Sequence, residues 1–508
     1  MRFALRFCAL IGAFGTMPLA VRLSGNTFQW TPYLIGITAL IFAAQILPRR
    51  GRWILAFLSG LLLTAELGNI TALGRPIFYD QVLAFIESPI NTWHTSAPYL
   101  LWWMWPTMVI AIVALTAWFG VTFNWIREQR TDTRMRSTIF CSTLAVIATF
   151  AASSATLMDV TYSSFPLFKI PQSLKYKHSF VSAERQIPTA HVTASKAPNI
   201  LWIIGEGMDK EAMSLYGSEF ETTPHLEGLL RDRQGYYYRD VMAPGKFTVM
   251  SHYLLLNFTD PEHFSVSTPS VFGYMKSAGY QTSYLSSRSL RWGRLNQAVS
   301  SGVDKHIDVR ALKPRSDLLA GVDDGQFIES VLLPHWNESI DAGPSFVVWQ
   351  MNGSHLPYAD KSPAEFKKFD DEYLNSVLYS DHNLAKLLSE IDDQTWIFFI
   401  SDHGKKSMNA DTNQVPMFII PPADTQPDVR EFLRLNQQAP IAGNDISLTL
   451  ARLAGHTTVH ELSLPYFSLH EELAAQGRSR YSCAWEGSFF LFIETSSCQK
   501  TVGRDPKS

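Results

Sequence analysis

Five long apolar segments occupy the first part of the chain, up to about residue 160. Each holds roughly 20 mostly apolar residues, the length that an α-helix needs to cross the hydrocarbon core of a bilayer. The segments are Phe3–Val21, Trp30–Pro48, Trp53–Leu73, Pro98–Ile126 and Ser137–Met158. The first also fits a secretory signal peptide, but four further spans favour an anchor. The pattern therefore predicts a transmembrane domain of five helices over residues 1–158.

The arginines between these segments predict the orientation of the domain, because short cytoplasmic loops are enriched in Lys and Arg. Two alternate loops hold only Arg22 and Arg75. The start of the chain and the other two loops hold Arg2, Arg6, Arg49, Arg50, Arg52, Arg127, Arg130, Arg134 and Arg136. This places the N-terminus in the cytoplasm and everything after Met158 outside. In a bacterium, such a protein is a multi-pass inner-membrane protein with a periplasmic C-terminal domain.

Residues 159–198 mix prolines with polar and aromatic residues and are expected to form a linker on the membrane surface. From 199 to 508, apolar β-rich runs alternate with helical patterns, which is typical of an α/β sheet covered on both faces. The expected strands are Asn199–Gly205, Gln281–Ser286, Pro344–Met351, Thr395–Ser401 and Pro416–Pro421. The expected helices are Thr223–Arg231, Thr248–Leu255, Pro269–Ala278, Pro363–Glu390 and Ile446–Ala454.

A hairpin is expected near the C-terminus, from Tyr481–Trp485 and Phe489–Glu494. Cys483 and Cys498 lie at its two sides, in the half of the chain that is expected to be exported. Because exported thiols oxidise, these two residues are predicted to form a disulfide.

Composition and charge exclude several classes of protein. The chain is 46% hydrophobic and 18% charged, which is too apolar for disorder. Its net charge of -3 gives no basic footprint, so nucleic acid is not an expected partner. With only four cysteines, it is neither a disulfide-built scaffold nor a four-cysteine zinc ribbon.

Polar residues follow three of the expected strands. Glu206 ends the first, Ser401–Gly404 the fourth, and Asn352–His355 the third. Ligands of open α/β sheets gather at the carboxyl ends of the strands. Taken one at a time, an acidic residue at a strand end is usually a helix cap, and an Asp-His pair often lies on the surface without a function. Together, two carboxylates and an imidazole suit zinc.

Longer motifs surround these residues. They are Ile204–Asp209, Ser214–Gly217, Glu221–Leu226, Gly353–Tyr358 and Ser401–Gly404. In this order they resemble the bacterial phosphoethanolamine transferases, which belong to the sulfatase branch of the alkaline phosphatase superfamily. The resemblance covers essentially the whole chain and implies five transmembrane helices followed by a periplasmic sulfatase-like α/β sandwich domain.

The resemblance also implies a catalytic site. Glu206, Asp402 and His403 would hold one zinc ion together with the hydroxyl of Thr248. Whether a second zinc ion binds is left open. Thr248 would be the nucleophile, because Gly245–Ser251 follows the Gly-x-x-Thr-x-x-Ser spacing. Thr248 is favoured as the nucleophile; the alternative is that Thr248 is only a helix N-cap, with Ser251 as the nucleophile. His355 would act as general acid or base.

Two local features bear on the substrate. Asn413 stands where the resembled enzymes have a second histidine, and is a candidate substrate contact. Arg291–Arg294 is similar to the Trp-x-Arg element of lipoteichoic acid synthases, so that Trp292 and Arg294 are candidates to contact the head group and phosphate; the alternative is that both merely cover the sheet. Lys246 is a further candidate to balance phosphate charge.

The implied reaction moves phosphoethanolamine from phosphatidylethanolamine, through a phosphothreonine, to an envelope glycolipid or glycan. The acceptor could be lipid A, the lipopolysaccharide core or a periplasmic glucan. Phosphoglycerol transfer, hydrolysis by a phosphodiesterase or sulfatase, and a sulfatase-like lipid sensor without activity are the alternatives.

Overall fold

The computed structural model describes ten stretches of the 508-residue chain and a few single residues between them. The stretches are 47–73, 104–128, 197–258, 269–290, 302–314, 321–355, 361–405, 413–456, 479–485 and 496–502. The chain divides into two compact units, residues 1–181 with 486–495 and residues 182–485 with 496–508. Each unit is described by itself.

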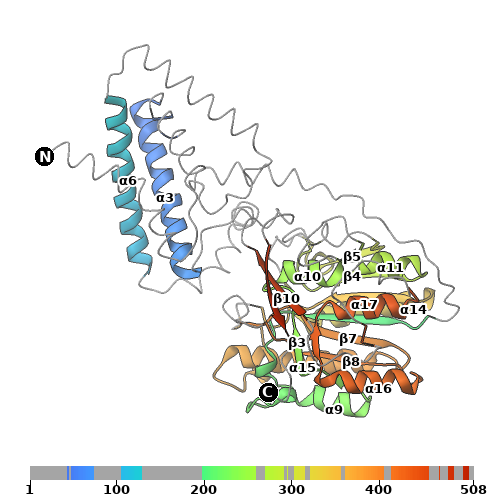
Figure 1. Ribbon diagram of the computed structural model, residues 1–508. Coiled ribbons are helices and arrows are strands. Elements are labelled where there is room, and N and C mark those ends of the chain that lie inside the picture. The colour runs from blue at the N-terminus through green and yellow to red at the C-terminus, as the bar shows by residue number, and fades with distance from the viewer. Residues whose placement is uncertain are drawn as a thin grey trace. The chain divides into compact units, whose positions relative to one another are not determined.

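Two helices of the first unit are described, α3 (Arg49–Leu73) and α6 (Met104–Glu128), and they pack side by side (Figure 1). Arg52 Nε donates a hydrogen bond to Asn124 Oδ1 at 3.0 Å. The backbones approach closely at Gly60, where an added Cβ would lie 2.8 Å from the Thr116 nitrogen. Small residues at such crossings are typical of helices that associate in membranes.

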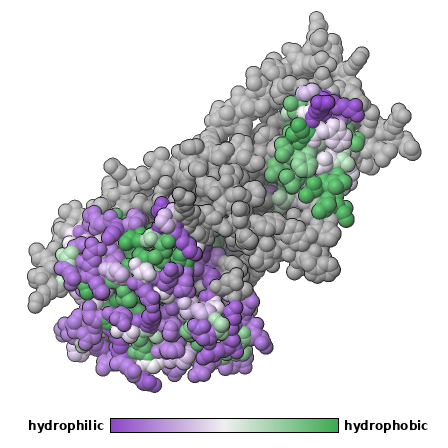
Figure 2. Space-filling model, turned by 180° about the vertical axis from the view of Figure 1, so that it is seen from behind, coloured by the Kyte–Doolittle hydropathy of each residue, from purple (hydrophilic) through white to green (hydrophobic). Residues whose placement is uncertain are grey.

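The outer surfaces of α3 and α6 are apolar (Figure 2). Exposed side chains include Ile54, Phe57, Val109, Ile110 and Val113. Among the described residues, one helical stretch, Arg49–Gly68, is long and apolar enough to cross a membrane, and Val109–Asn124 is a shorter apolar stretch. These helices correspond to the third and fourth expected spans. The first and fifth spans, and most of the second, lie outside the described residues, so a five-helix domain stays a prediction.

The second unit is built on a seven-stranded sheet with the order β2-β8-β7-β1-β6-β4-β5. Its strands are β1 (Ile200–Gly205), β2 (Tyr236–Tyr237), β4 (Gln281–Ser286), β5 (Lys305–Ile307), β6 (Ser345–Gln350), β7 (Trp396–Ser401) and β8 (Met417–Ile420). The neighbours from β7 to β5 run parallel, whereas β8 is antiparallel to both β7 and β2. The carboxyl ends of β1, β6 and β7 therefore lie along one edge.

Helices cover both faces of this sheet (Figure 1). They are α9 (Pro224–Asp232), α10 (Thr248–Leu256), α11 (Val271–Ser277), α13 (Asp324–Phe327), α14 (Leu333–Ala342), α15 (Glu372–Glu390), α16 (Pro427–Leu435) and α17 (Asp445–Leu453). One core cluster joins one sheet face to α9, α14 and α15. On the other face Phe272 of α11 packs against Phe346 of β6, with 5.3 Å between ring centroids. Strands buried on both faces explain the nearly continuous apolar runs in the sequence.

The five predicted strands are confirmed to within one residue at each end as β1, β4, β6, β7 and β8. Four predicted helices are confirmed to within two residues as α9, α10, α11 and α17. The prediction of one helix over Pro363–Glu390 is wrong at its start, because α15 begins at Glu372. Asp371 caps it by accepting a hydrogen bond from the Tyr373 nitrogen at 2.8 Å.

The predicted hairpin is described only in part. Strand β10 (Ser479–Trp485) pairs antiparallel with β11 (Ser496–Val502), and the second expected strand, Phe489–Glu494, lies outside the described residues. Cys483 stands directly opposite Cys498 in this register. The sequence patterns also missed helices α13, α14 and α16 and the short parallel pair β3 (Asp240–Met242) and β9 (Pro440–Ala442).

Candidate metal centre and active site

The register of β1 and β7 brings two acidic residues together. Gly205, the last residue of β1, is paired with Ser401, the last residue of β7, so that Glu206 and Asp402 leave the sheet side by side. The turn after Glu206 needs glycine, since Gly207 has φ +65°, and its nitrogen donates a hydrogen bond to Asp402 Oδ1 at 3.0 Å. Main-chain contacts thus fix the Asp402 carboxylate before any ligand is considered, since the His403 nitrogen also donates a hydrogen bond to its Oδ1 at 2.7 Å.

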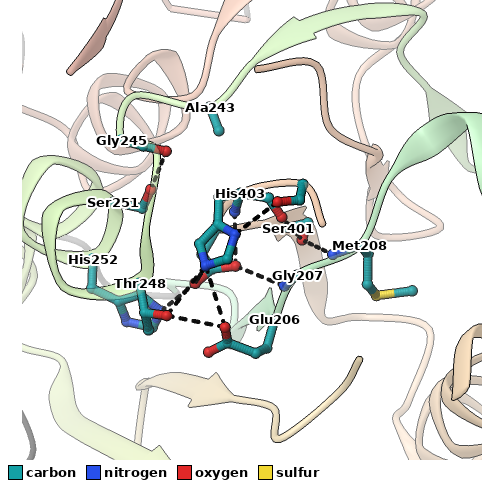
Figure 3. A network of polar contacts seen from close by, with 12 residues as sticks. Glu206, Gly207, Met208, Ala243, Gly245, Thr248, Ser251, His252, Ser401 and His403 are labelled. Carbon is teal, nitrogen blue, oxygen red and sulfur yellow. Dashed lines mark hydrogen bonds and ion pairs between the residues drawn. The ribbon is translucent and has the colours of Figure 1, made fainter. Parts of the chain in front are cut away.

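Helix α10 supplies the candidate nucleophile, Thr248, which is its first residue. The preceding loop passes so close to the helix that a Cβ on Gly245 would lie 2.5 Å from the Ser251 nitrogen, and therefore only glycine fits there. Ser251 Oγ donates a hydrogen bond to the Gly245 carbonyl at 2.8 Å (Figure 3). The Ser251 hydroxyl therefore bonds the loop to helix α10, whereas the Thr248 side chain faces Glu206.

The side chains of Thr248, Glu206 and His403 converge on one point (Figure 3). The Asp402 carboxylate lies beside His403. Thr248 Oγ1 donates a hydrogen bond to Glu206 Oε1 at 3.0 Å and lies 3.3 Å from His403 Nε2. His403 Nε2 lies 3.4 Å from Glu206 Oε1 and 3.5 Å from Asp402 Oδ2. Potential ligand atoms of Glu206, Asp402 and His403 all fall within 4.8 Å of one another.

The buried acidic side chains of Glu206 and Asp402 favour a positive charge beside them. Burial and the negative charge of Glu206 raise the pKa of Asp402. Burial opposes protonation of His403, but the charge of Asp402 and the contact with Glu206 raise its pKa to about 9. Burial likewise opposes ionisation of Glu206, yet the hydrogen bond with His403 and the charge of Arg288 lower its pKa overall. The His403 imidazole thus stabilises the negative charge of Glu206 beside the buried Asp402.

The same residues fit a metal ion. Glu206 Oε2 and Asp402 Oδ2 are buried and, among the described residues, make no hydrogen bond. Two carboxylates, an imidazole and a hydroxyl form a donor set that zinc accepts, and metal binding displaces the proton that a free histidine carries. The predicted ligands are therefore brought together as a possible metal site, with Thr248 beside it.

The remaining predicted site residues lie differently. His355 follows β6 and is close enough for its charge to act on Glu206. Lys246 is partly buried in the loop before α10. Asn413 is buried, and its amide binds the main chain at Gly245 and Gly404. Trp292 and Arg294 lie outside the described residues. Substrate contacts by these residues stay predictions.

Three buried or partly buried basic groups near the site escaped the sequence patterns. His252 is fully buried, and burial lowers its pKa to about 3. Arg288 is buried just beyond β4, and its charge acts on Glu206. Burial, followed by the charge of Arg288, lowers the pKa of Lys361 to about 7. Only His252 had a usable signal, since it follows Thr248 by four residues and so shares its helix face.

Comparison with known proteins agrees with this fold and site. The family model described as Sulfatase matches residues 198–456, just over half of the chain. The chain therefore belongs to the sulfatase family, and the resemblance seen in its motifs is confirmed.

Several relatives are phosphoethanolamine transferases. EptC of Escherichia coli O18:K1:H7 is 24% identical over 234 residues, which are 41% of this chain and 39% of that protein. EptA of Helicobacter pylori is 22% identical over 340 residues, 62% of this chain and 57% of that protein. The chain thus spans between two fifths and three fifths of the length of these relatives.

Among solved structures, the integral membrane lipooligosaccharide phosphoethanolamine transferase A of Neisseria meningitidis covers 89% of this chain and 95% of its own, with a TM-score of 0.57. At 15% identity, this likeness shows a shared fold and no more.

Proposed function

We propose that this protein is a zinc-dependent phosphoethanolamine transferase of the bacterial inner membrane, with its catalytic domain in the periplasm. It would move phosphoethanolamine from phosphatidylethanolamine to an envelope glycolipid or glycan. The observation that carries the proposal is the position of the Thr248 hydroxyl, 3.0 Å from Glu206 Oε1 and 3.3 Å from His403 Nε2. A threonine hydroxyl held within a possible metal site is suited to nucleophilic attack on phosphorus.

In the first half-reaction Thr248 Oγ1 forms a bond to the donor phosphorus, and the bond from phosphorus to the diacylglycerol oxygen breaks. The hydroxyl proton passes toward Glu206 Oε1, which already accepts the hydrogen bond from Thr248. His355 gives a proton to the leaving diacylglycerol. Zinc, when bound, would act as a Lewis acid and lower the pKa of the hydroxyl.

In the second half-reaction an acceptor hydroxyl or phosphate attacks the phosphothreonine, the bond from phosphorus to Thr248 Oγ1 breaks, and Oγ1 takes back its proton from Glu206. His355 then removes the proton from the acceptor, the reverse of its first role. Thr248 is the first residue of a nine-residue helix, so the positive end of the helix dipole favours the negative charge that builds up there. The buried charge of Arg288 acts in the same direction.

Membrane attachment suits this reaction. Donor lipid and diacylglycerol both reside in the bilayer, so a tethered domain meets them at a raised effective concentration. The apolar surfaces of α3 and α6 support such a tether. The acceptor class is supported by relatives, among them the Kdo(2)-lipid A phosphoethanolamine 7''-transferase of Escherichia coli, 22% identical over 230 residues.

The test offers the purified full-length protein labelled phosphatidylethanolamine or phosphatidylglycerol, with and without a lipid A acceptor. We expect faster diacylglycerol release from phosphatidylethanolamine, and label on Thr248 in a peptide digest. Thr248→Ala should abolish both, whereas Ser251→Ala should still be labelled at Thr248. Faster release from phosphatidylglycerol would support the phosphoglycerol alternative, label on Ser251 would move the nucleophile, and equal release without acceptor would indicate a hydrolase.

A further inference from the structure

The side chain of Arg480 joins the C-terminal hairpin to the strand that leads to the candidate nucleophile. Arg480 lies on β10, and its side chain is only 6% exposed. Its Nη1 atom donates a hydrogen bond to Asp240 Oδ1 at 2.7 Å and another to the Asp240 carbonyl at 3.2 Å. Within the described ranges, Asp240 is the one acidic residue that pairs with it. Because an arginine is almost never buried unless it is paired, this contact fixes the position of both side chains.

Asp240 stands at the start of the segment that carries Thr248. It is the first residue of β3, which lies beside β10 and pairs with β9 (Figure 1). After β3 the chain forms the loop at Gly245 and then begins helix α10 with Thr248. The hairpin therefore holds the strand from which the nucleophile loop begins.

The same carboxylate oxygen of Asp240 also binds Gln414. Asp240 Oδ1 accepts a hydrogen bond from Gln414 Nε2 at 2.7 Å. Gln414 Oε1 accepts one from Lys210 Nζ, which also donates to the Arg239 carbonyl at 2.6 Å. Lys210 follows the loop that leaves β1 with Glu206. Asp240 thus connects three segments, which are the hairpin, the loop after β1 and the segment at Gln414.

The segment at Gln414 is bonded to the loops of the site by its main chain and by the neighbouring Asn413. The Ala243 nitrogen donates a hydrogen bond to the Asn413 carbonyl at 2.9 Å, and the Val415 nitrogen donates one to the Val241 carbonyl at 3.1 Å. The Asn413 side chain binds the main chain of the loop before the nucleophile and of the loop after the metal-binding histidine. A shift of this segment would therefore move both loops.

Removal of the Arg480 guanidinium would free the Asp240 carboxylate, whose side chain is 35% exposed. The carboxylate would then turn toward water or toward Lys210 Nζ, whose charge already interacts with it. Either movement breaks the hydrogen bond to Gln414, and with it one restraint on both loops. The possible metal ligands are other residues, so the effect falls on geometry and leaves the donor set intact.

We propose that Arg480 is a positioning residue of the active site. By holding Asp240 against Gln414, it keeps the loops that carry Thr248 and His403 at the distance that the transfer step needs. The C-terminal hairpin is then part of the framework of the site, although it contributes no catalytic residue. The activity readout rests on the proposed function, whereas a readout of main-chain opening needs no lipid.

The activity test measures transfer from phosphatidylethanolamine by full-length protein in detergent. In Arg480→Ala, kcat should fall about tenfold, since misplacing reacting groups by about 1 Å can cost about 100-fold. KM should stay within about twofold and bound zinc should not change, because the loss falls on the position of Thr248 and not on lipid binding. Arg480→Lys should recover part of the loss, since an ammonium also donates to a carboxylate.

A double variant tests the route from Arg480 to the site. Gln414→Ala removes the link between Asp240 and the two loops, so kcat should fall by a similar factor. Arg480→Ala combined with Gln414→Ala should be no slower than Gln414→Ala alone, because losses within one network do not add. Multiplied losses would show that Arg480 acts through other contacts and would overturn the proposal. Unchanged kcat in Gln414→Ala would overturn it as well, even if no Arg480 variant folds.

Hydrogen–deuterium exchange measures the loosening directly. The Ala243 and Val415 amides bond across the two segments and are the reporters. In Arg480→Ala both should exchange at least about tenfold faster, on the scale of a lost charge-assisted hydrogen bond. Unchanged exchange at both amides would overturn the proposal.

The matched control is Arg233→Ala. Arg233 is a partly buried arginine whose guanidinium donates hydrogen bonds to the carbonyls of Leu388, Ile391 and Asp392, at the end of α15. This variant should keep wild-type kcat and wild-type exchange at the two reporter amides. Equal losses of kcat in Arg233→Ala and Arg480→Ala would show a general effect of destabilisation and would count against the proposal.

The two readouts separate this inference from the proposed function. Faster exchange in Arg480→Ala, in a protein whose wild type transfers no phosphoethanolamine, would keep the positioning role and defeat the function. Normal transfer by the wild type with unchanged exchange in Arg480→Ala would do the reverse.

Discussion

Asn413 ties together the two loops that carry the candidate nucleophile and the metal-binding histidine. It is 2% exposed. Its Oδ1 accepts a hydrogen bond from the Gly404 nitrogen at 3.2 Å, and its Nδ2 donates to the Gly245 carbonyl at 2.5 Å. Gly404 follows His403 directly, and Gly245 lies in the loop that leads into α10. We therefore expect Asn413→Ala to loosen Thr248 relative to His403.

The stability cost follows from what each partner loses. The Gly245 carbonyl keeps a hydrogen bond from Ser251 Oγ at 2.8 Å, so it is not orphaned. The buried Gly404 nitrogen has no second acceptor among the described residues, and leaving such a group unpaired costs about 1–3 kcal/mol. Asn413→Ala should therefore lower the free energy of unfolding by about 2 kcal/mol.

The effect on activity should be larger than the effect on stability. Misplacing reacting groups by about 1 Å can cost about 100-fold in rate, and Thr248 Oγ1 sits only 3.3 Å from His403 Nε2. We expect transfer by Asn413→Ala to fall about 10- to 100-fold in kcat while zinc stays bound. Denaturant unfolding followed by fluorescence, zinc analysis and single-turnover transfer measure the three quantities on full-length protein in detergent.

The control is Asn375→Ala. Asn375 is also buried, and its Oδ1 accepts hydrogen bonds from the Lys368 and Phe369 nitrogens, both at 2.8 Å, but it lies on α15. This variant should be destabilised at least as much as Asn413→Ala and keep nearly normal transfer. If the two variants lose activity equally at equal stability, Asn413 does not position the site and the reasoning is refuted.

Three further predictions concern other parts of the chain. Cys483 and Cys498 stand opposite each other in β10 and β11, and directly opposed residues are close enough for a disulfide. Alkylation without reductant should therefore label neither cysteine. Labelling of both would disprove the bridge. The arginine asymmetry predicts that a phosphatase fusion after Met158 is active and one between Trp125 and Arg136 inactive; the reverse result would overturn the periplasmic assignment. Burial lowers the pKa of Lys361 from 10.5 to about 7. Between these pH values the folded state therefore binds fewer protons than the unfolded state. The free energy of unfolding should rise with pH across that window and be constant below it. Lys361→Met should be more stable than wild type at pH 7, with the difference shrinking by pH 10; a pH-independent difference in Tm would contradict this.

The sheet strands were predictable because their local environment is uniform. Strand β1, for example, is buried along its whole length, as a parallel strand covered on both faces must be, and its apolar run therefore marks its ends to within one residue. The start of α15 was not predictable in the same way. Asn375 bonds back to Lys368 and Phe369 and holds that segment out of the helix, which no apolar periodicity reveals.

The candidate site shows the same difference between features that local sequence predicts and features that depend on tertiary contacts. By itself, the sequence determined that Glu206, Asp402 and His403 follow strands of one sheet, because residue type and strand end are both local properties. Only the tertiary structure decided that Gly205 pairs with Ser401, which puts residues 195 positions apart, Gly207 and Asp402, within 3.0 Å. It also decided that His252 faces Asp402 and that Asn413 joins two loops. Such contacts depend on strand register and helix packing, and polar residues buried by them carry no periodic signal in the chain.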